Sequence, residues 1–332
     1  ACTTCGACED ACPVTIEYVD KIVDMRRAAV EDGRVPTSLL KALADVEKKG
    51  NPYGKMARKR GEWVKGDGDA DASVRVLKKG EEAGCLFFTD SCAAFDPRIQ
   101  QIGRAFARLL GAAGEDVGTL GKDEKDSGNE VRRIGEEGLF EVLREANEDA
   151  IAERDVERVV TTDPHAFNAL RNDYALDRPV EHHTQVLDRL LADGKLKLGA
   201  LDDGKTYTFH DPCYLGRHND EYDAPRRVLD AIPGLKTVEM DRSRNRSFCC
   251  GGGSLYLFHE GESEERMGEL RLGMAADAGA DVVVTACPFC LINLEDALKT
   301  TGRAEAMEVV DLAELVERAA APAAAMTDAA AS

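Results

Sequence analysis

Two adjacent cysteines, Cys249 and Cys250, run directly into three glycines in the stretch FCCGGG. Neighbouring cysteines rarely bond to each other, because a disulfide needs its two α-carbons further apart and its side chains facing. The chain has eleven cysteines, an odd number gathered in short-spaced groups, which suits metal ligation better than a disulfide framework. The chemistry to expect is thiolate binding of a metal centre.

A second group of cysteines opens the chain. Cys2, Cys5, Cys8 and Cys12 stand in the order C-x2-C-x2-C-x3-C-P. This spacing is typical of the bacterial ferredoxin run, in which three thiolates bind one [4Fe-4S] cube and the fourth commonly serves a second cube. A zinc site would normally bring two separated cysteine pairs, so the pattern favours iron-sulfur.

The fourth cysteine of this run leaves two alternatives open. If Cys12 serves a second cube, the other ligands need a sister motif that is absent downstream, and the chain is the C-terminal part of a longer protein. Otherwise the chain is complete, its initiator methionine removed, and all four cysteines bind one cube. Two amphipathic helical patterns follow the motif, the second closed by Gly50.

The adjacent pair belongs to a downstream set with the spacing C-x35-C-C-x36-C-x2-C. The three glycines lack a β-carbon, so the backbone can approach a metal centre and direct N–H groups at its sulfurs. Cys287 follows the buried-strand pattern ADVVVTA and opens a helix, whose N-terminal dipole favours thiolates. A structural zinc site is the competing interpretation, although zinc takes four ligands and has no use for a fifth. The five cysteines are Cys213, Cys249, Cys250, Cys287 and Cys290.

Three histidines, His210, His218 and His259, lie near this set in the sequence. They are either ligands or proton donors, or hydrogen-bonded structural residues, with His210 beside Asp211 the first candidate for a functional role.

The elements that must position the cysteines occur twice along the chain. The stretch 158–170 resembles 282–294, and 91–114 resembles 212–234. In each copy an apolar run leads into a proline turn and then a helical pattern, which predicts two tandem α/β units. At a constant offset of 124, the matching residues are Val160, Thr161, Pro164 and Leu170 with Val284, Thr285, Pro288 and Leu294.

The sequence stretches HDPCYLGR, CCGGG and ACPFC, with the five-cysteine spacing, resemble the CCG motif of heterodisulfide reductases and related iron-sulfur oxidoreductases. The resemblance covers nearly the whole chain, because that family joins a ferredoxin module to two such domains in this order. It implies an α/β fold with two tandem CCG-type domains, preceded by a partial α-helical ferredoxin-like [4Fe-4S] module. It also implies that Cys213, Cys249, Cys250, Cys287 and Cys290 hold a non-cubane [4Fe-4S] cluster in which at least one sulfur bridges.

The first copy departs from this pattern. Cys92 takes the place of Cys213, but the other four slots hold Asp126, Ser127, Asp163 and Ala166. One thiolate cannot hold an iron-sulfur cluster, and two carboxylates suit only a hard cation. We therefore expect no cluster in the first copy, which would pack against the second and close one wall of the site. Cys85 is either a replacement ligand or a strand core residue.

These features divide the chain. We expect the ferredoxin-type module and its helices over 1–50, a connector over 51–80, the degenerate first domain over 81–200 and the intact second domain over 201–318. Tyr53 and Trp63 are candidates to dock the connector on a neighbour. The alanine-rich stretch 319–332 offers nothing to pack, so a disordered tail is expected.

The net charge of −19 argues against nucleic acid or an anionic membrane surface as the main partner. The acidic excess is typical of a halophilic, haloarchaeal-like surface, or else of a docking face for a basic partner. No apolar run approaches the roughly 20 residues that a membrane span requires. We expect a cytoplasmic location or one at the cytoplasmic face of the membrane, with any membrane portion upstream.

No G-x-G-x-x-G fingerprint opens a helix, so neither flavin nor NAD is expected on this chain. HDPCYLGR and GNPYGKMARKRGEW resemble the branch that couples flavoproteins to the quinone pool. The leading hypothesis is an iron-sulfur electron-transfer subunit, reduced by an electron-transfer flavoprotein or FAD dehydrogenase and oxidised by a quinone. The alternatives are a heterodisulfide-type disulfide reductase, the iron-sulfur subunit of a glycolate or lactate oxidase, and a non-enzymatic assembly subunit.

Overall fold

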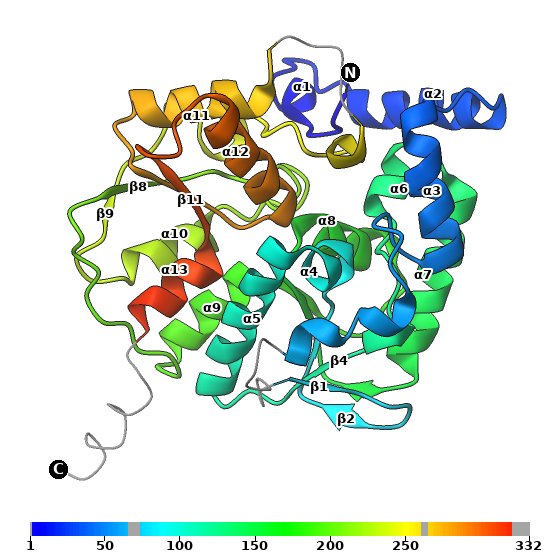
Figure 1. Cartoon of the computed structure of the whole chain (residues 1–332), viewed down its shortest axis with the longest axis horizontal. Helices are drawn as coiled ribbons and strands as arrows, with labels where there is room; N and C mark the ends of the chain where they lie inside the picture. Colours follow the sequence, from blue (N-terminus) through cyan, green and yellow to red (C-terminus); the bar gives the residue numbers. More distant parts are fainter. Residues whose placement is uncertain (1, 66–73, 260–264, 321–332) are drawn as a thin grey trace.

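The computed structural model describes residues 2–65, 74–259 and 265–320, which form two parallel sheets with helices packed around them (Figure 1). One sheet has the strand order β1-β4-β3-β6-β7 and the other has the order β11-β10-β8-β9. The strands of the first are β1 (Val74–Val76), β4 (Val117–Thr119), β3 (Cys85–Phe87), β6 (Val159–Thr161) and β7 (Val180–His182). Those of the second are β11 (Glu308–Asp311), β10 (Val282–Thr285), β8 (Thr206–Phe209) and β9 (Lys236–Thr237).

The two sheets are copies of one unit. In chain order, β3, β4, β6 and β7 correspond to β8, β9, β10 and β11, and both sets are arranged in the same spatial order with every pairing parallel. The inner strands are apolar along nearly their whole length, as strands buried on both faces must be. The predicted tandem α/β repeat is confirmed. A separate parallel pair joins β2 (Glu82–Ala83) to β5 (Asp155–Val156).

The stretch 51–80, expected as a connector, also contributes a strand to the first sheet. Its last residues form β1, which pairs with β4 and adds a fifth strand to the first sheet. Trp63, in the 3-10 helix η2 (Glu62–Lys65), is 2% exposed and packs edge-on against Phe87. The short strand was hidden because it follows a polar, turn-rich stretch, of which 66–73 lie outside the described residues. The 3-10 helix η1 (Ala57–Lys59) precedes it.

Equivalent helices of the two copies pack across the interface between them. α5 (Pro97–Ala112) of the first copy lies against α13 (Leu312–Ala319) of the second, and α10 (Asp223–Asp230) of the second lies against α9 (His183–Ala192) of the first. Charged pairs bridge both contacts, Arg98 to Glu314 at 2.7 Å and Arg227 to Asp188 at 2.7 Å. Because the same two helices make contact in both directions between the copies, the two domains are related by an approximate two-fold axis.

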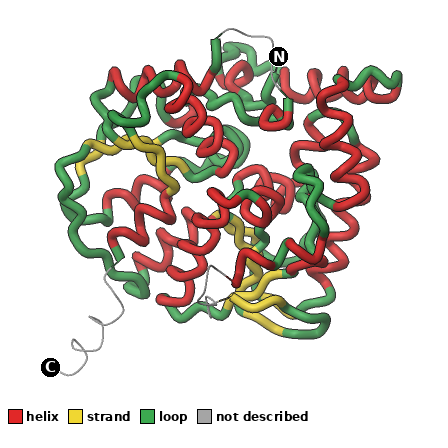
Figure 2. Tube along the Cα trace, viewed as in Figure 1, coloured by secondary structure: helices red, strands yellow, loops and turns green. Residues whose placement is uncertain are grey.

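Caps in the sequence fix where these helices begin. Asp96 accepts hydrogen bonds from the N–H groups of Arg98 and Ile99, with Pro97 in the first turn of α5. Asp311 and Glu314 form a capping box at the start of α13. The other helices of the two domains are α4 (Asp90–Phe95), α6 (Asn129–Arg133), α7 (Glu137–Ala152), α8 (Pro164–Asn168), α11 (Met267–Asp277) and α12 (Pro288–Thr300). Figure 2 shows helices beside both groups of strands, with some strands of the first sheet reaching the lower edge of the view.

The N-terminal segment is helical, with α1 (Ala7–Asp10), α2 (Tyr18–Glu31) and α3 (Thr37–Lys49). α3 ends as predicted at Gly50, whose φ of +70° is the left-handed conformation that favours glycine. Leu39 and Leu43 of α3 share a small core with Ile134 and with Leu255 of the second copy. The segment therefore packs on both domains.

The end of the second domain extends slightly past the expected boundary. α13 runs through Ala319, and Ala320 forms a β-bridge with Leu198. The rest of the expected tail, 321–332, lies outside the described residues. Within the part of the chain that the structure describes, no helix is both long and apolar enough to cross a membrane.

Candidate metal centre

The five downstream cysteines lie together at the carboxyl edge of the second sheet. Cys213 follows β8, Cys287 follows β10 and caps α12, and Cys290 lies in the first turn of that helix. The adjacent pair lies in the loop before the 3-10 helix η6 (Tyr256–Phe258). All five side chains are buried, none more than 8% exposed. Parallel strands place their carboxyl ends at one edge, which is where ligands bind in such sheets.

Sulfur contacts connect these cysteines into one chain. Hydrogen bonds link Cys213 to Cys249, Cys249 to Cys250, Cys250 to Cys290, and Cys290 to Cys287. The set proposed from spacing is therefore a single cluster of sulfurs separated by up to 77 positions in the sequence.

The glycine run brings backbone N–H groups close to these sulfurs, as expected for residues without side chains. The N–H of Gly251 donates to the Cys249 sulfur at 3.3 Å, and the N–H of Gly252 donates to the Cys250 sulfur at 3.4 Å. Gly251 has a φ of +94°, and a β-carbon on Gly252 would lie 3.1 Å from the carbonyl oxygen of Phe289. Backbone donors aimed at sulfur stabilise the thiolate form.

The surroundings lower the pKa of Cys249, Cys250 and Cys287 and raise the pKa of Cys213 and Cys290, so the thiolate form is favoured at three of the five sulfurs. Hydrogen bonds from Cys249 and then Cys290 lower the pKa of Cys250 well below its ordinary value. Burial alone would raise the pKa of Cys287, but hydrogen bonds from Cys290 and His165 lower it to about 7. Five buried thiols with backbone donors match the needs of an iron-sulfur centre, whereas zinc would leave one thiol without a role.

The N-terminal cysteines lie directly beside this set. The sulfur of Cys5 forms a hydrogen bond with Cys249, and the Thr3 hydroxyl lies 3.4 Å from the same sulfur. Arg217 donates through Nε to the carbonyl oxygen of Cys5 at 2.7 Å, which ties the N-terminal loop to the second copy. The two cysteine groups, some 240 positions apart in the sequence, form one continuous site.

Within the N-terminal motif, Cys12 has different contacts from the other three cysteines. Cys8 is exposed and has Cys5 and Cys2 among its charged neighbours. The sulfur of Cys12 instead accepts a hydrogen bond from the N–H of Ile16 at 3.4 Å and lies 4.0 Å from the Tyr18 hydroxyl. Cys2, Cys5 and Cys8 thus lie near one another, and Cys12 has its own contacts with Ile16 and Tyr18.

The equivalent slots of the first copy hold buried polar residues. Cys92, Asp126, Ser127 and Asp163 line an enclosed cavity of about 10 Å³, roughly the space of one water molecule. Burial raises the pKa of Asp163 to about 6, and one of its carboxylate oxygens has no hydrogen-bond partner. Asp90 also lines this cavity and was not anticipated from the sequence. Among the described residues, its carboxylate does not converge with the other two closely enough to suggest a metal site.

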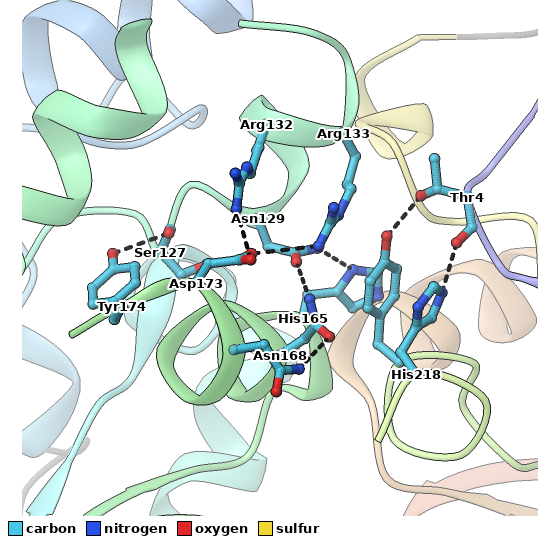
Figure 3. Close-up of polar contacts among 12 residues, drawn as sticks. Thr4, Ser127, Asn129, Arg132, Arg133, His165, Asn168, Asp173, Tyr174 and His218 are labelled. Atoms are coloured by element: carbon cyan, nitrogen blue, oxygen red, sulfur yellow. Dashed lines mark hydrogen bonds and ion pairs between the residues drawn. The ribbon is translucent and has the colours of Figure 1, made fainter. Parts of the chain in front are cut away.

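The histidines near the motif have distinct surroundings. His210 lies with Cys250 and Cys290 in a group whose ligand atoms are all within 4.8 Å, and its Nδ1 accepts from Nε of Arg271 at 3.0 Å. His218 bonds to the carbonyl oxygen of Thr4 at 2.8 Å, as Figure 3 shows. His259 contacts Ser38 and is not part of the sulfur cluster.

Two further residues change the sequence-based picture. Cys85 is fully buried in β3, where burial raises its pKa to about 12, so of the two alternatives it is the strand core residue. His165 of the first copy was missed, although it forms a hydrogen bond with Cys287 of the second. Burial would lower the pKa of His165, but Glu130 and Cys287 raise it well above the ordinary value. The repeat offset aligns His165 with Phe289, which is not a ligand slot, so the sequence carries no signal for this contact.

Comparison with known proteins gives the same two units. The model of the cysteine-rich domain called CCG matches residues 86–171 and 207–295. The chain is 41% identical over 322 residues to a Bacillus subtilis protein named "Probable iron-sulfur-binding oxidoreductase FadF", covering 95% of this chain and 46% of the relative. It is 34% identical over 329 residues to a second relative, the "EtfAB:quinone oxidoreductase" of Syntrophomonas wolfei, covering 96% of this chain and 46% of the relative.

A third relative is shorter. A subunit of the "Dihydromethanophenazine:CoB--CoM heterodisulfide reductase" of Methanosarcina barkeri is 34% identical over 333 residues, covering 96% of this chain and 77% of the relative. The chain spans about half the length of the first two relatives. With both CCG units matched and the cysteine cluster assembled, the chain belongs to the CCG cysteine-rich domain family of iron-sulfur oxidoreductases.

Proposed function

We propose that this chain is the iron-sulfur electron-transfer part of an oxidoreductase that takes electrons from a flavoprotein and delivers them to a quinone-type acceptor. The observation that carries the proposal is the contact between Cys5 and Cys249, which joins the N-terminal thiols to the buried thiol cluster in one site. A relative named EtfAB:quinone oxidoreductase supports the choice of donor and acceptor.

The residues divide into two sets that would each hold a centre. Cys2, Cys5 and Cys8 would hold a ferredoxin-type [4Fe-4S] centre, and Cys12 would serve either this centre or a separate one. Cys213, Cys249, Cys250, Cys287 and Cys290 would hold the second, as a [4Fe-4S] centre of non-cubane form. When bound, such centres accept and release single electrons.

The remaining side chains hold these thiols in place and exclude water. Arg26 donates to the carbonyl oxygen of Cys2 and to the Ser254 hydroxyl, and Arg217 donates to the carbonyl oxygen of Cys5. The Thr4 hydroxyl lies 2.7 Å from that of Tyr214, which is fully buried. Together these contacts tie the N-terminal loop to the second copy, so both thiol groups keep a fixed separation.

Disulfide reduction is a second candidate, because the chain covers most of a relative named as part of a heterodisulfide reductase. The same thiol cluster serves both hypotheses, and only the acceptor differs. For either function we propose a place at the cytoplasmic face of the membrane, reached through a partner or a further part of the protein, as the greater length of the relatives suggests.

The first experiment measures iron and acid-labile sulfide per chain after anaerobic purification, with EPR of the oxidised and reduced states. Cys249→Ser/Cys250→Ser should lose about four irons and one set of EPR signals. Cys85→Ala, which changes a buried thiol away from the site, should keep both. Unchanged iron in the double variant, or zinc in place of iron, would refute the proposal.

The second experiment identifies the acceptor. The reduced protein is mixed separately with a menaquinone analogue and with a low-molecular-weight disulfide, and its reoxidation is followed by the loss of the reduced EPR signal. Rapid reoxidation by the quinone alone supports the leading proposal. Reoxidation by the disulfide alone replaces it with the second candidate.

A further inference from the structure

One side chain of the first copy reaches into the thiol cluster of the second. His165 lies in α8, at the carboxyl end of the first sheet, and forms a hydrogen bond with the sulfur of Cys287. His165, Asp163 and Cys287 form a buried group whose ligand atoms are all within 4.8 Å of one another. The copy that lost its cysteines therefore still contacts the site.

The imidazole of His165 is fixed on all sides. Its Nδ1 lies 2.6 Å from Oε1 of Glu130, and its ring packs between the rings of Tyr214 and Phe289 at centroid distances of 4.4 and 4.3 Å. His165 is 3% exposed and Glu130 is 4% exposed. A side chain held in this way cannot turn away from Cys287 without breaking the bond to Glu130 and leaving a buried carboxylate unpaired.

Glu130 is itself held by both copies. Its Oε2 accepts from the N–H of Leu255 in the second copy at 3.0 Å, and its Oε1 accepts from Nδ2 of Asn129 at 2.9 Å. Asn129 is anchored in turn by Nδ2 of Asn168, as Figure 3 shows. A carboxylate with this many donors is a fixed acceptor, so Nδ1–H of His165 donates to Glu130 and Nε2 is left for the sulfur. In the charged imidazole both nitrogens carry a proton, so Nε2–H can donate to Cys287.

The approximate two-fold axis explains why the histidine lies here. His165 and Phe289 occupy equivalent positions, 124 residues apart, and their rings pack against each other. Each therefore crosses toward the site of the opposite copy, and Phe289 lines the small cavity among the carboxylates of the first copy. His165 thus brings a hydrogen-bond donor to the thiols of the second copy, whereas Phe289 brings an apolar ring to the cavity of the first.

We propose that His165, held by Glu130, is a positioning residue that donates a hydrogen bond to the Cys287 sulfur and raises the reduction potential of the centre bound there. Hydrogen bonds to ligand sulfurs are among the features that set the potentials of iron-sulfur centres, because they stabilise the added negative charge of the reduced state. The first copy thereby tunes a centre that only the second copy holds. The inference rests on the iron-sulfur centre proposed above.

The test is an EPR-monitored redox titration of the full chain, on the signal that Cys249→Ser/Cys250→Ser removes. His165→Phe keeps a ring between Tyr214 and Phe289, and copies the residue that the second copy carries at this position. It should lower the equilibrium constant for reduction at least tenfold, which is a midpoint about 59 mV more negative for one electron. Glu130→Gln keeps the imidazole but weakens its orientation, and should shift the midpoint in the same direction by less.

His259→Gln is the matched control, because this histidine lies near the motif in the sequence without contacting the thiol cluster. Its midpoint should equal that of the unaltered protein. If His165→Phe does not assemble the centre, the midpoint of Glu130→Gln is the test. An unshifted midpoint in that variant overturns the inference. Unshifted midpoints in both variants at full iron content also overturn it, while the proposed function stands. Absence of the signal from the unaltered protein overturns the proposed function and the inference together.

Discussion

Replacing Gly253 with alanine should loosen the N-terminal cysteine loop from the second copy. A β-carbon at position 253 would lie 2.6 Å from the carbonyl oxygen of Thr3, whereas real β-carbons essentially never come within 3.0 Å. The atom in the way is backbone, so Thr3 must retreat by about 0.4 Å or the glycine loop must move by as much.

The free-energy cost of this substitution follows from the contacts near Thr3. A retreat strains the contact of its hydroxyl with the Cys249 sulfur at 3.4 Å, the Thr4 bond to Tyr214 at 2.7 Å and the Thr4 bond to His218 at 2.8 Å. Overpacking costs about 1–3 kcal/mol, and one or two neutral hydrogen bonds at about 1 kcal/mol each give the same range. We expect local opening of the loop to be favoured by about 1–3 kcal/mol, or roughly 5- to 150-fold.

The assay is hydrogen exchange followed by mass spectrometry, comparing a peptide that covers residues 2–12 with one that covers β10. Exchange should accelerate by roughly 5- to 150-fold in the first peptide and stay unchanged in the second. Gly138→Ala is the matched control, because a β-carbon there meets nothing within 4 Å. Unchanged exchange over residues 2–12, or equal acceleration in both peptides, would show that this contact does not hold the loop.

The remaining predictions concern stability, pH and cysteine identity. Glu124→Gln should lower the free energy of unfolding by about 3–5 kcal/mol, because it leaves the buried guanidinium of Arg60 without its charged partner at 2.9 Å. Denaturant unfolding should show a much smaller loss for Arg60→Met/Glu124→Leu, and equal losses in both variants would contradict the argument. Burial lowers the pKa of His218 to about 4, from 6.5 in the unfolded chain. The unfolded chain therefore binds the extra proton more readily, so stability is full above about pH 6.5 and falls toward pH 4. Urea midpoints across that range should show the fall, and it should be smaller in His218→Gln; an identical pH profile would contradict this. Cys85→Ala should keep its full iron content, and loss of iron would restore this residue as a ligand candidate.

The sequence predicted the parts of the site whose chemistry lies in residue type and spacing. Five thiols and a glycine run have few uses other than a metal centre, so Cys213 and Cys290 could be grouped although 77 positions separate them. The repeat could be recognised because buried parallel strands leave an apolar run that survives when the ligands do not.

The parts that could not be predicted depend on contacts between the copies. Nothing in the sequence near His165 indicates that it faces Cys287, because that contact arises from the approximate two-fold axis. Asp90 is also invisible in a pattern of ligand slots, since it lies before the aligned cysteine and outside every slot. β1 was missed because three residues after a polar stretch carry too little periodicity.

The reciprocal packing of equivalent helices across the two-fold axis bears on how the ligand residues of the two copies can change during evolution. None of the five cysteines lies in the helices of these contacts, α5 on α13 and α10 on α9, so a copy can change its ligands without changing the helices that join the pair. A duplicated gene that begins with two equal halves is then free to specialise. Here the second copy carries the five thiols, and the first copy carries His165, which contacts one of them.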